Sequence, residues 1–506
     1  MQTRQRYFKP YTIPAYVVDF LLQCCTILCS TTVYSDSPQT LTGLLLLPAI
    51  ATYLQPKAED PVEVDENGKP IEPEDDVKEE DRDPLPVKPF ITSYRGAMMI
   101  ITCTSILAVD FPVFPRRFGK TEAFGTSLMD LGVGSFVFAA GIVAARQQLK
   151  EDMKQIKKSF TTRMKTALRH SFPLFILGII RLLSVKGLDY AEHVSEYGVH
   201  WNFFFTLALL GPIFALIQPV LRFLPSYGGV AFAIAVCYEI ALYTTDLKFY
   251  IILSDRIPGD LLSQNREGVF SFIGYFAIFL GGMGVGQGIL PRDEEPPPTA
   301  VEQGKILRDS MDDDEEWLTS VLAPGAGTTN TEGEPAAPAT QPSFRPEDAI
   351  QMVSALPRLA VVHLIKWAGL WFIFSTWALW VYGPRLVVSR RMANCAYVCW
   401  VCAFNSAQLL LFCGVEMLMF PTLYRSRNKG VEKQRIEDAT SKVLKAFNRN
   451  GLALFLLANL LTGAVNLGSE TWYVSDVQAM CVLVGYIGTI CATGLVLDHY
   501  DISIKL

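Results

Sequence analysis

The chain alternates between apolar stretches and shorter polar joints, and it also contains two long polar segments. The apolar stretches have about the 20 residues of helix that are needed to cross the hydrocarbon core of a bilayer. They lack the alternation of apolar and polar residues that is typical of a transmembrane β-strand. We therefore expect an all-α polytopic membrane protein with about twelve transmembrane helices, at residues 15–34, 40–55, 91–110, 126–145, 172–187, 201–222, 227–246, 268–290, 359–381, 394–421, 450–467 and 477–498.

The polar joints between these stretches indicate how the helices are oriented. Clusters of lysines and arginines lie in the N-terminus and in the joints 146–169 and 425–449, which twelve spans place on the same side. Because cationic loops tend to stay in the cytosol, we expect both termini on the cytosolic side. Two joints on the other side nevertheless carry three cations each, namely Arg116, Arg117 and Lys120, and Arg385, Arg390 and Arg391. Cations retained against the rule suggest a function on that side.

The two long polar segments are expected to be disordered cytosolic loops. Residues 56–88 are acidic, and residues 292–355 are rich in Pro, Gly, Thr and acidic residues. Neither segment has enough apolar residues to offset the entropy lost on ordering. The predicted organisation is a cytosolic N-terminus, two helices, the acidic loop, a six-helix region, the second loop, four helices and a cytosolic tail, at residues 1–14, 15–55, 56–88, 89–291, 292–355, 356–498 and 499–506.

Composition agrees with this assignment and adds little about chemistry. Of the 506 residues, 50% are hydrophobic and 19% are charged, and the net charge of −6 arises mostly in the long loops. The 11 cysteines lie in or beside apolar stretches, so we interpret them as small packing residues. No Ser-His-Asp order, phosphate-binding loop or dinucleotide motif occurs. We expect no nucleic-acid partner and a monomeric protein.

The densest group of charges beside an apolar stretch lies in LAVDFPVFPRRFGKTEAFGTSLMDLGVGSFVF, which starts at Leu107. Asp110 ends one span, and two prolines then prevent a regular helix from continuing. Arg116, Arg117 and Lys120 follow, and arginine offers a planar fork for phosphate whereas lysine offers a point charge. Two interpretations fit, a ligand site or a turn held at the headgroups by its charges.

A second polar stretch, RLLSVKGLDYAEHVSEYGVHWN, emerges on the same side. Its candidate substrate-facing residues are Arg181, Lys186, His193, Glu196, Tyr197, His200, Trp201 and Asn202. On a helix, residues 193, 196 and 200 would share one face. Their order differs from the HExxH motif of metalloproteases and no third ligand is evident, so we expect no metal site.

Polar residues inside the spans form the third signal. Asn459 and Asn466 are seven residues apart, with Thr462 between them, and therefore lie on one helix face. Such a stripe points into a bundle, where it either joins helices or binds substrate. Ionisable residues within spans are costly, so each either pairs in the bundle or has a function. They are Asp19, Asp130, Arg181, Glu239, His363 and Glu416.

Three blocks of the chain resemble the glycosylphosphatidylinositol (GPI) inositol acyltransferase family. They are YRGAMMIITCTSILAVDFPVFPRRFGKTEAFGTSLMDLGVGSFVF, EHVSEYGVHWNFFFTLALL and FNRNGLALFLLANLLTGAVNL, and the resemblance runs from about Tyr94 to the C-terminus. It implies a multi-pass endoplasmic reticulum enzyme that transfers a palmitoyl chain from palmitoyl-CoA to the inositol 2-hydroxyl of glucosaminyl-phosphatidylinositol. Acyl-CoA is then a co-substrate, membrane lipid surrounds the site, and no cofactor is expected. The family has about thirteen spans, and the first would precede the start of this chain.

The implied reaction assigns roles to the residues above, with 89–291 as the catalytic membrane region. Asp110 is the first candidate for the general base, His200 the second and His363 the third. Lys120 would hold that carboxylate, bind phosphate or stabilise the oxyanion, and Arg116 and Arg117 would bind phosphate groups.

The span after Asp130 is the candidate acyl tunnel, through Val133 and Phe136, because Gly132 and Gly134 leave room beside them. A lipid or solute transporter and a non-catalytic assembly subunit are the alternative classes. One question is how acyl-CoA, which is made in the cytosol, reaches polar joints on the lumenal side.

Overall fold

The computed structural model describes residues 11–55, 83–155, 158–187, 196–221, 223–224, 226–292, 358–382, 388–420, 423–424 and 429–504. Within these ranges the chain forms helices and loops, without a strand. Eleven of the described helices are long and apolar enough to cross a membrane, and Pro38–Leu54 is a shorter apolar helix. The prediction of an all-α polytopic membrane protein is therefore confirmed, with a helix in each of the twelve predicted stretches. Most of the two predicted disordered loops lies outside the described residues.

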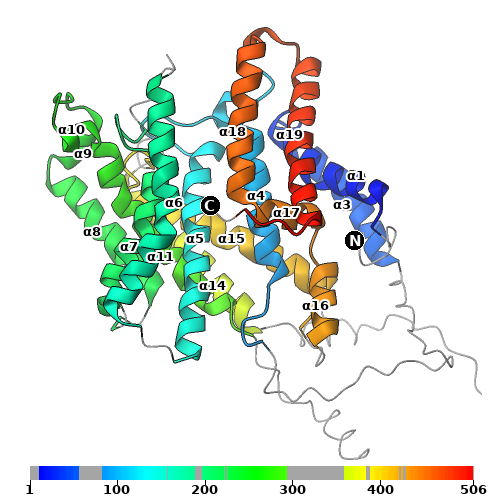
Figure 1. Cartoon of the computed structure of the whole chain (residues 1–506), viewed down its shortest axis with the longest axis horizontal. Coiled ribbons are helices and arrows are strands. Elements are labelled where there is room, and N and C mark those ends of the chain that lie inside the picture. Colours follow the sequence, from blue (N-terminus) through cyan, green and yellow to red (C-terminus); the bar gives the residue numbers. More distant parts are fainter. Residues whose placement is uncertain are drawn as a thin grey trace, which may run out of the picture. The chain divides into compact units, whose positions relative to one another are not determined.

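The helices follow one another as the hydropathy pattern predicts, with additional short helices in the joints. In chain order they are α1 (Ile13–Phe20), the π-helical turn η1 (Leu21–Cys25), α2 (Thr26–Thr31), α3 (Pro38–Leu54), α4 (Pro89–Ala108), η3 (Arg116–Phe118), α5 (Leu128–Met153), α6 (Phe160–Gly187), α7 (Phe203–Leu221), α8 (Tyr227–Thr244), α9 (Leu247–Ile252), α10 (Leu261–Gln264), α11 (Arg266–Ile289), α14 (Arg358–Tyr382), α15 (Cys395–Met419), α16 (Lys429–Asp438), α17 (Lys442–Arg449), α18 (Gly451–Gly468), η4 (Thr471–Tyr473) and α19 (Asp476–His499) (Figure 1).

Short polar side chains fix where the helices around the polar joints begin. Ser127 Oγ accepts a hydrogen bond from the backbone N of Asp130 at the start of α5, at 3.2 Å. Asn394 Oδ1 does the same for the backbone N of Tyr397 at the start of α15, at 3.3 Å. Such caps satisfy backbone donors that the first turn of a helix leaves without partners. The ends of these joints are therefore held in place relative to the helices.

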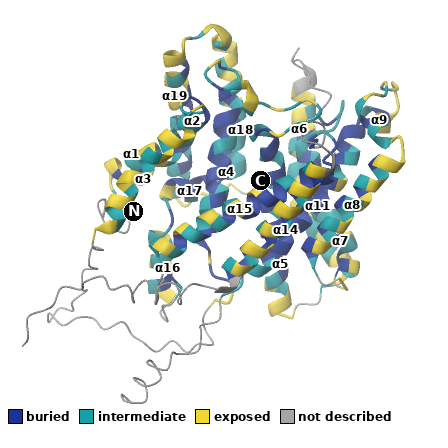
Figure 2. Cartoon of the chain, turned by 180° about the vertical axis from the view of Figure 1, so that it is seen from behind, coloured by how far each residue is buried: buried dark blue, intermediate teal, exposed yellow. Residues whose placement is uncertain are grey.

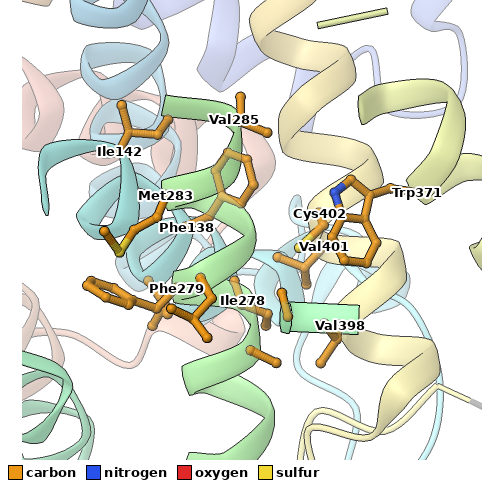
Figure 3. Close-up of a cluster of buried hydrophobic side chains, with 14 of the residues drawn as sticks. Phe138, Ile142, Ile278, Phe279, Met283, Val285, Trp371, Val398, Val401 and Cys402 are labelled. Carbon is orange, nitrogen blue, oxygen red and sulfur yellow. The ribbon is translucent and has the colours of Figure 1, made fainter. Parts of the chain in front are cut away.

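The most buried helix is α11, which packs against α5, α8, α14 and α15. In its most apolar window 78% of the residues are buried, against 6% in α6 and 11% in α18. Figure 2 shows the buried residues concentrated on inner helices such as α11. In Figure 3, Phe138 and Ile142 of α5 lie beside Phe279 and Met283 of α11, and Val401 of α15 lies across from them. The outer helices α6 and α18 present most of their surface to the surroundings.

Glycines allow α5 and α11 to approach closely. A Cβ added at Gly141 would lie 2.1 Å from the carbonyl oxygen of Phe279, and one added at Gly282 would lie 2.1 Å from that of Phe138. Small residues at a crossing let two helix backbones touch, which is a common way of packing helices in membranes. This crossing therefore requires glycine at both positions.

We expect Gly141→Ala to lower the thermal unfolding midpoint of the purified protein, because overpacking a tight contact costs about 1–3 kcal/mol. Gly132→Ala on the same helix is the matched control, since nothing lies within 4 Å of a Cβ added there. Thermal unfolding of both variants in the same detergent tests the prediction. An equal midpoint for the two variants would show that the crossing tolerates a side chain.

A second apolar cluster joins α4 to the C-terminal helices α17, α18 and α19. The joint 425–449, expected to be a polar loop, contains α17, and its Val443 and Phe447 are fully buried. The buried carboxylate of Asp19 accepts hydrogen bonds from Ser441 Oγ at 2.9 Å and from the backbone N of Val443 at 3.3 Å. Asp19 therefore supports the start of α17, which is the structural alternative foreseen for a charged residue near a span end.

Candidate active site

Polar joints that are far apart in the chain meet at one end of the described bundle. Lys120, in the joint after α4, pairs with Glu196, which lies before α7, at 3.0 Å. Ser389, before α15, donates its Oγ to the carbonyl oxygen of Ala123 at 2.6 Å. We call the end that is formed by residues 109–127, 196–202 and 388–394 the loop face.

Asp110 lies in the turn that follows α4, partly exposed on the loop face. Its Oδ2 accepts a hydrogen bond from Asn466 Nδ2 of α18 at 2.9 Å. Phe111 and Phe114 are fully buried and anchor the turn. The sequence marks Asp110 and Asn466 as separate candidates, and the structure brings them into contact. Within the described residues Oδ1 of Asp110 has no hydrogen-bond partner, so it is available to accept a proton.

The two arginines after Asp110 hold this turn in place. Arg116 donates to the carbonyl oxygen of Val109 at 2.8 Å, and its guanidinium lies 4.5 Å from the centre of the Trp472 ring. Arg117 pairs with Asp36 at 2.7 Å, with 52% of its side chain exposed. Of the two interpretations of these cations, the geometry supports the structural one directly. Binding of phosphate by Arg116 and Arg117 stays a prediction.

Lys120 belongs to a chain of alternating charges. Its Nζ contacts both carboxylate oxygens of Glu196, at 3.0 and 3.2 Å. Glu196 in turn lies 3.4 Å from Nη2 of Arg390, whose Nε donates to Asp130 at 2.8 Å. The sequence singles out all four residues, but it does not predict that they form one chain. In the described part of the protein no ion pair joins Lys120 to Asp110, although the sequence suggested that Lys120 holds that carboxylate.

Asp130 lies beneath the loop face instead of on it. Its side chain is fully buried. The carboxylate accepts hydrogen bonds from Thr121 Oγ1 and Ser127 Oγ, both at 2.8 Å, as well as from Arg390. With these donors around it, Asp130 holds the joint that carries Lys120. The prediction that Asp130 contacts substrate is therefore not supported by this geometry.

The second polar stretch is tied to the start of α11. Asn265 Oδ1 accepts hydrogen bonds from the backbone N of His200 at 2.8 Å and of Trp201 at 2.9 Å. His200 Nε2 lies 3.1 Å from Gln264 Oε1. Asn202 donates to the carbonyl oxygen of Gly178 at 2.9 Å, and its Oδ1 accepts from the first turn of α7. These contacts place His200 on the loop face, whereas the side chain of Asn202 caps the first turn of α7.

The remaining candidates lie in different surroundings. Tyr197 is buried, whereas Arg181 is exposed on α6. Asn459 donates to the carbonyl oxygen of Phe455 within its own helix at 2.7 Å. The side chain of Lys186, and His193 and Arg385 entirely, lie outside the described residues. No group of three or more metal-ligating side chains occurs in the described part of the chain.

A cavity of about 910 Å³ lies between α4, α5, α6, α7 and the junction of α17 with α18. Its apolar part is lined by residues that include Phe136, Phe203, Phe204, Leu207 and Phe455. Phe136 is six residues after Asp130 on α5, so this part begins about 9 Å along the helix from the loop face. The polar part lies at the other end of α5 and includes Arg95, Gln147, Gln148, Glu151, Lys158, Arg163, His170, Asn448, Arg449 and Asn450.

Several polar atoms at this end lack partners within the described residues. Gln148 Oε1, Arg163 Nε and Asn448 Oδ1 are buried without a hydrogen bond. The Arg95 side chain forms no hydrogen bond or ion pair with another described residue. Buried polar groups are normally satisfied, and an arginine in a membrane interior normally has a partner. The polar end of the cavity therefore suits an anionic ligand.

Only some of the residues predicted to line an acyl tunnel on α5 line the cavity, and the tunnel itself stays a prediction. Phe136 lines the cavity, together with Ala140 and Val143 farther along the helix. Gly134 does not, because a Cβ there would lie 2.7 Å from Val401 of α15. Val133 is partly buried against the main core and is not a lining residue.

Sequence reasoning missed Arg95, Arg163 and Asn448, and it overestimated His363. Arg95 sits in the second turn of α4, where a cation looks like an ordinary helix-start residue, although a charge within a span is a signal that was available. His363 accepts a hydrogen bond from Trp367 Nε1 at 2.9 Å and does not line the cavity.

Comparison with known proteins agrees with the resemblance of the three sequence blocks. The GWT1 family profile matches residues 1–497. A protein of Aspergillus fumigatus named GPI-anchored wall transfer protein 1 is 45% identical over 514 aligned residues, covering 100% of this chain and 91% of that protein. The proteins of the same name from Saccharomyces cerevisiae and Candida albicans are 37% and 36% identical, covering 97% of this chain and 89% and 90% of their own lengths. The family assignment made from the sequence is thus confirmed, and the chain belongs to the GWT1 family.

Proposed function

We propose that the chain transfers a fatty acyl chain, typically palmitoyl, from acyl-CoA to the inositol 2-hydroxyl of glucosaminyl-phosphatidylinositol, in GPI-anchor synthesis at the endoplasmic reticulum membrane. The observation that carries the proposal is the cavity, in which the unpaired Arg95 and Arg163 lie at one end and aromatic residues at the other. An acyl-CoA has the matching chemistry, with phosphates at one end and a long neutral chain at the other. The names of the relatives, which refer to GPI-anchored wall transfer, agree with a GPI lipid as the acceptor.

The reaction requires proton removal from the hydroxyl, stabilisation of an oxyanion and positioning of both substrates. Asp110 takes the proton as the hydroxyl oxygen attacks the thioester carbonyl. Lys120 lies in the same joint, where its ammonium stabilises negative charge on the oxyanion or on the lipid phosphate. Collapse of the tetrahedral intermediate forms the ester and expels the coenzyme A thiolate, which takes up a proton. His200 is the alternative base on the loop face.

The cavity also supports a route by which a cytosolic donor would reach the loop face. Its polar part lies at the end of α5 that leads into the cationic joint 146–169, which the positive-inside rule assigns to the cytosol. A donor bound there by its phosphates extends through the apolar part toward the joint that carries Asp110. The acceptor lipid then needs to approach the loop face from the surrounding membrane.

The direct test is acyl transfer by the purified protein with palmitoyl-CoA and glucosaminyl-phosphatidylinositol, read by mass spectrometry of the lipid. We expect an acylated lipid and free coenzyme A in equal amounts. Movement of either substrate across sealed vesicles without any acyl transfer would indicate the transporter alternative. An inactive purified protein that gains activity only with other proteins would indicate an assembly subunit.

The cavity cations give a prediction about donor binding. Arg95→Ala and Arg163→Ala should each raise the KM for palmitoyl-CoA about 10-fold, because a hydrogen bond to a charged group contributes about 1.5–3 kcal/mol. Their kcat should change less, since neither residue lies on the loop face. Arg169→Ala is the matched control, because Arg169 is an exposed cation of α6 that does not line the cavity. A similar increase in KM for Arg169→Ala would show that the increase comes from general surface charge and not from donor binding in the cavity.

A further inference from the structure

The joint before α15 carries cations against the positive-inside rule. In the structure its neighbouring residues Arg390 and Arg391 pair with different carboxylates. Arg390 reaches Asp130 at 2.8 Å and Glu196 at 3.4 Å. Arg391 reaches Glu267 at 2.8 Å and donates to the carbonyl oxygen of Ile251 at 3.3 Å. Both side chains are largely buried, with 4% and 13% exposed. The same turn therefore supports two separate regions of the loop face.

Arg390 links the buried Asp130, through Glu196, to the more exposed Lys120. Asp130, at the start of α5, is fully buried, whereas 44% of the Lys120 side chain is exposed. Glu196 lies between them, with 21% of its side chain exposed. Burial by itself lowers the pKa of Arg390, but Glu196, Tyr197, Tyr275 and Asp130 together raise that pKa above its usual value, so Arg390 stays charged.

An isolated surface ion pair would not hold a lysine firmly. Such pairs contribute little, and a lysine side chain has a flexible four-carbon stem. Here the carboxylate partner of Lys120 is itself held by a buried guanidinium, and Asp130 also accepts from the backbone N of Thr121, the next residue after Lys120, at 3.3 Å. The buried carboxylate of Asp130 thus helps to position the Lys120 ammonium, through Arg390 and Glu196, and also the backbone next to Lys120.

We propose that Arg390 and Glu196 are positioning residues that hold the Lys120 ammonium on the loop face, with Asp130 as their buried anchor. The effect of this positioning on turnover rests on the proposed acyl transfer. The positioning itself does not, because it concerns only side chains of this chain. Arg390 is suited to this role because one guanidinium can contact two carboxylates at once, which a lysine ammonium cannot do with the same geometry.

Two measurements on Arg390→Lys, Glu196→Gln and the control Arg391→Lys test the proposal. The first is the rate at which an amine-reactive reagent labels Lys120 in the purified folded protein, read by peptide mass spectrometry. We expect several-fold faster labelling in Arg390→Lys and Glu196→Gln, and no change in Arg391→Lys. The second is acyl transfer, for which we expect kcat to fall about 10-fold in the first two variants with little change in the KM for the donor.

The possible results separate the two proposals. Unchanged labelling of Lys120 in Arg390→Lys and Glu196→Gln, with or without lower thermal stability, overturns the positioning role. Faster labelling with normal kcat in an active protein overturns its link to turnover. Faster labelling in a protein whose wild type transfers no acyl chain supports the positioning and overturns the proposed function. A kcat loss in Arg391→Lys equal to that in Arg390→Lys also overturns the proposal, because it would come from the turn as a whole.

Discussion

Asp110→Asn should lower the kcat of acyl transfer by about 100-fold or more, because it keeps the shape of the side chain and removes the proposed general base. The amide can still contact Asn466, so the turn after α4 should remain folded. Donor binding should change little, since the cavity-lining residues are untouched. The measurement is the rate of acyl-lipid formation at saturating palmitoyl-CoA, with the folded state of the variant checked by thermal unfolding.

Asp36→Asn is the matched control for this prediction. Asp36 is an acidic residue with 83% of its side chain exposed, and it pairs with Arg117 of the same joint. Its substitution removes a charge close to the turn without removing the proposed base, so kcat should stay near that of the wild type. Near-normal turnover in Asp110→Asn combined with loss of activity in His200→Ala would move the base to the histidine and contradict our assignment.

The transmembrane helices could be predicted from the sequence because apolar length is a local property of the chain. The helix predicted at residues 227–246 is observed as Tyr227–Thr244, and that predicted at 394–421 as Cys395–Met419. The amphipathic helix α17 was missed because its eight residues are too short and too polar for a span. Its Val443 and Phe447 are buried through contacts with other helices, chiefly α4 and α19, and a local pattern in the sequence does not reveal these contacts.

The charged residues of the loop face and their partner Asn466 were predicted from the sequence, but their pairings were not. Asp110 and Asn466 were both named, yet their contact joins residues 356 positions apart. Likewise, Lys120, Glu196 and Arg390 are each conspicuous in the sequence, but their pairing depends on how three joints meet. Single-sequence patterns carry periodicity and charge but no information about which joints are neighbours.

The cavity could not be predicted because no single segment encodes it. Its α5 wall contains Ala139, Ala140 and Ala144, which in a sequence look like residues for helix packing. Gly134, two turns earlier, looked like a place for an acyl chain and instead packs against Val401. A helix face lines a cavity where no neighbouring helix packs onto it, and becomes a packing face where one does. The residues of α6 and α18 lie across the cavity and leave this face of α5 uncovered.

Two ends of the molecule are therefore connected by one helix. Asp130 at the start of α5 supports the joint of Lys120, while Gln148 and Glu151 near its end line the polar part of the cavity. Under the proposed function, α5 would link donor binding on the expected cytosolic side to the chemistry proposed for the loop face. Any obstruction in the middle of α5 should then prevent a long donor from reaching the loop face.

Ala140→Trp should lower kcat/KM for palmitoyl-CoA about 100-fold, because Ala140 lines the middle of the cavity and an indole there would force costly overpacking on a long chain. Acetyl-CoA needs less of the apolar part, so its transfer should fall much less. Leu216→Trp is the matched control, since Leu216 of α7 is 52% exposed and does not line the cavity. The measurement is kcat/KM for donors of increasing chain length in both variants. An equal loss for acetyl-CoA and palmitoyl-CoA in a well-folded Ala140→Trp protein would show that the cavity does not hold the acyl donor.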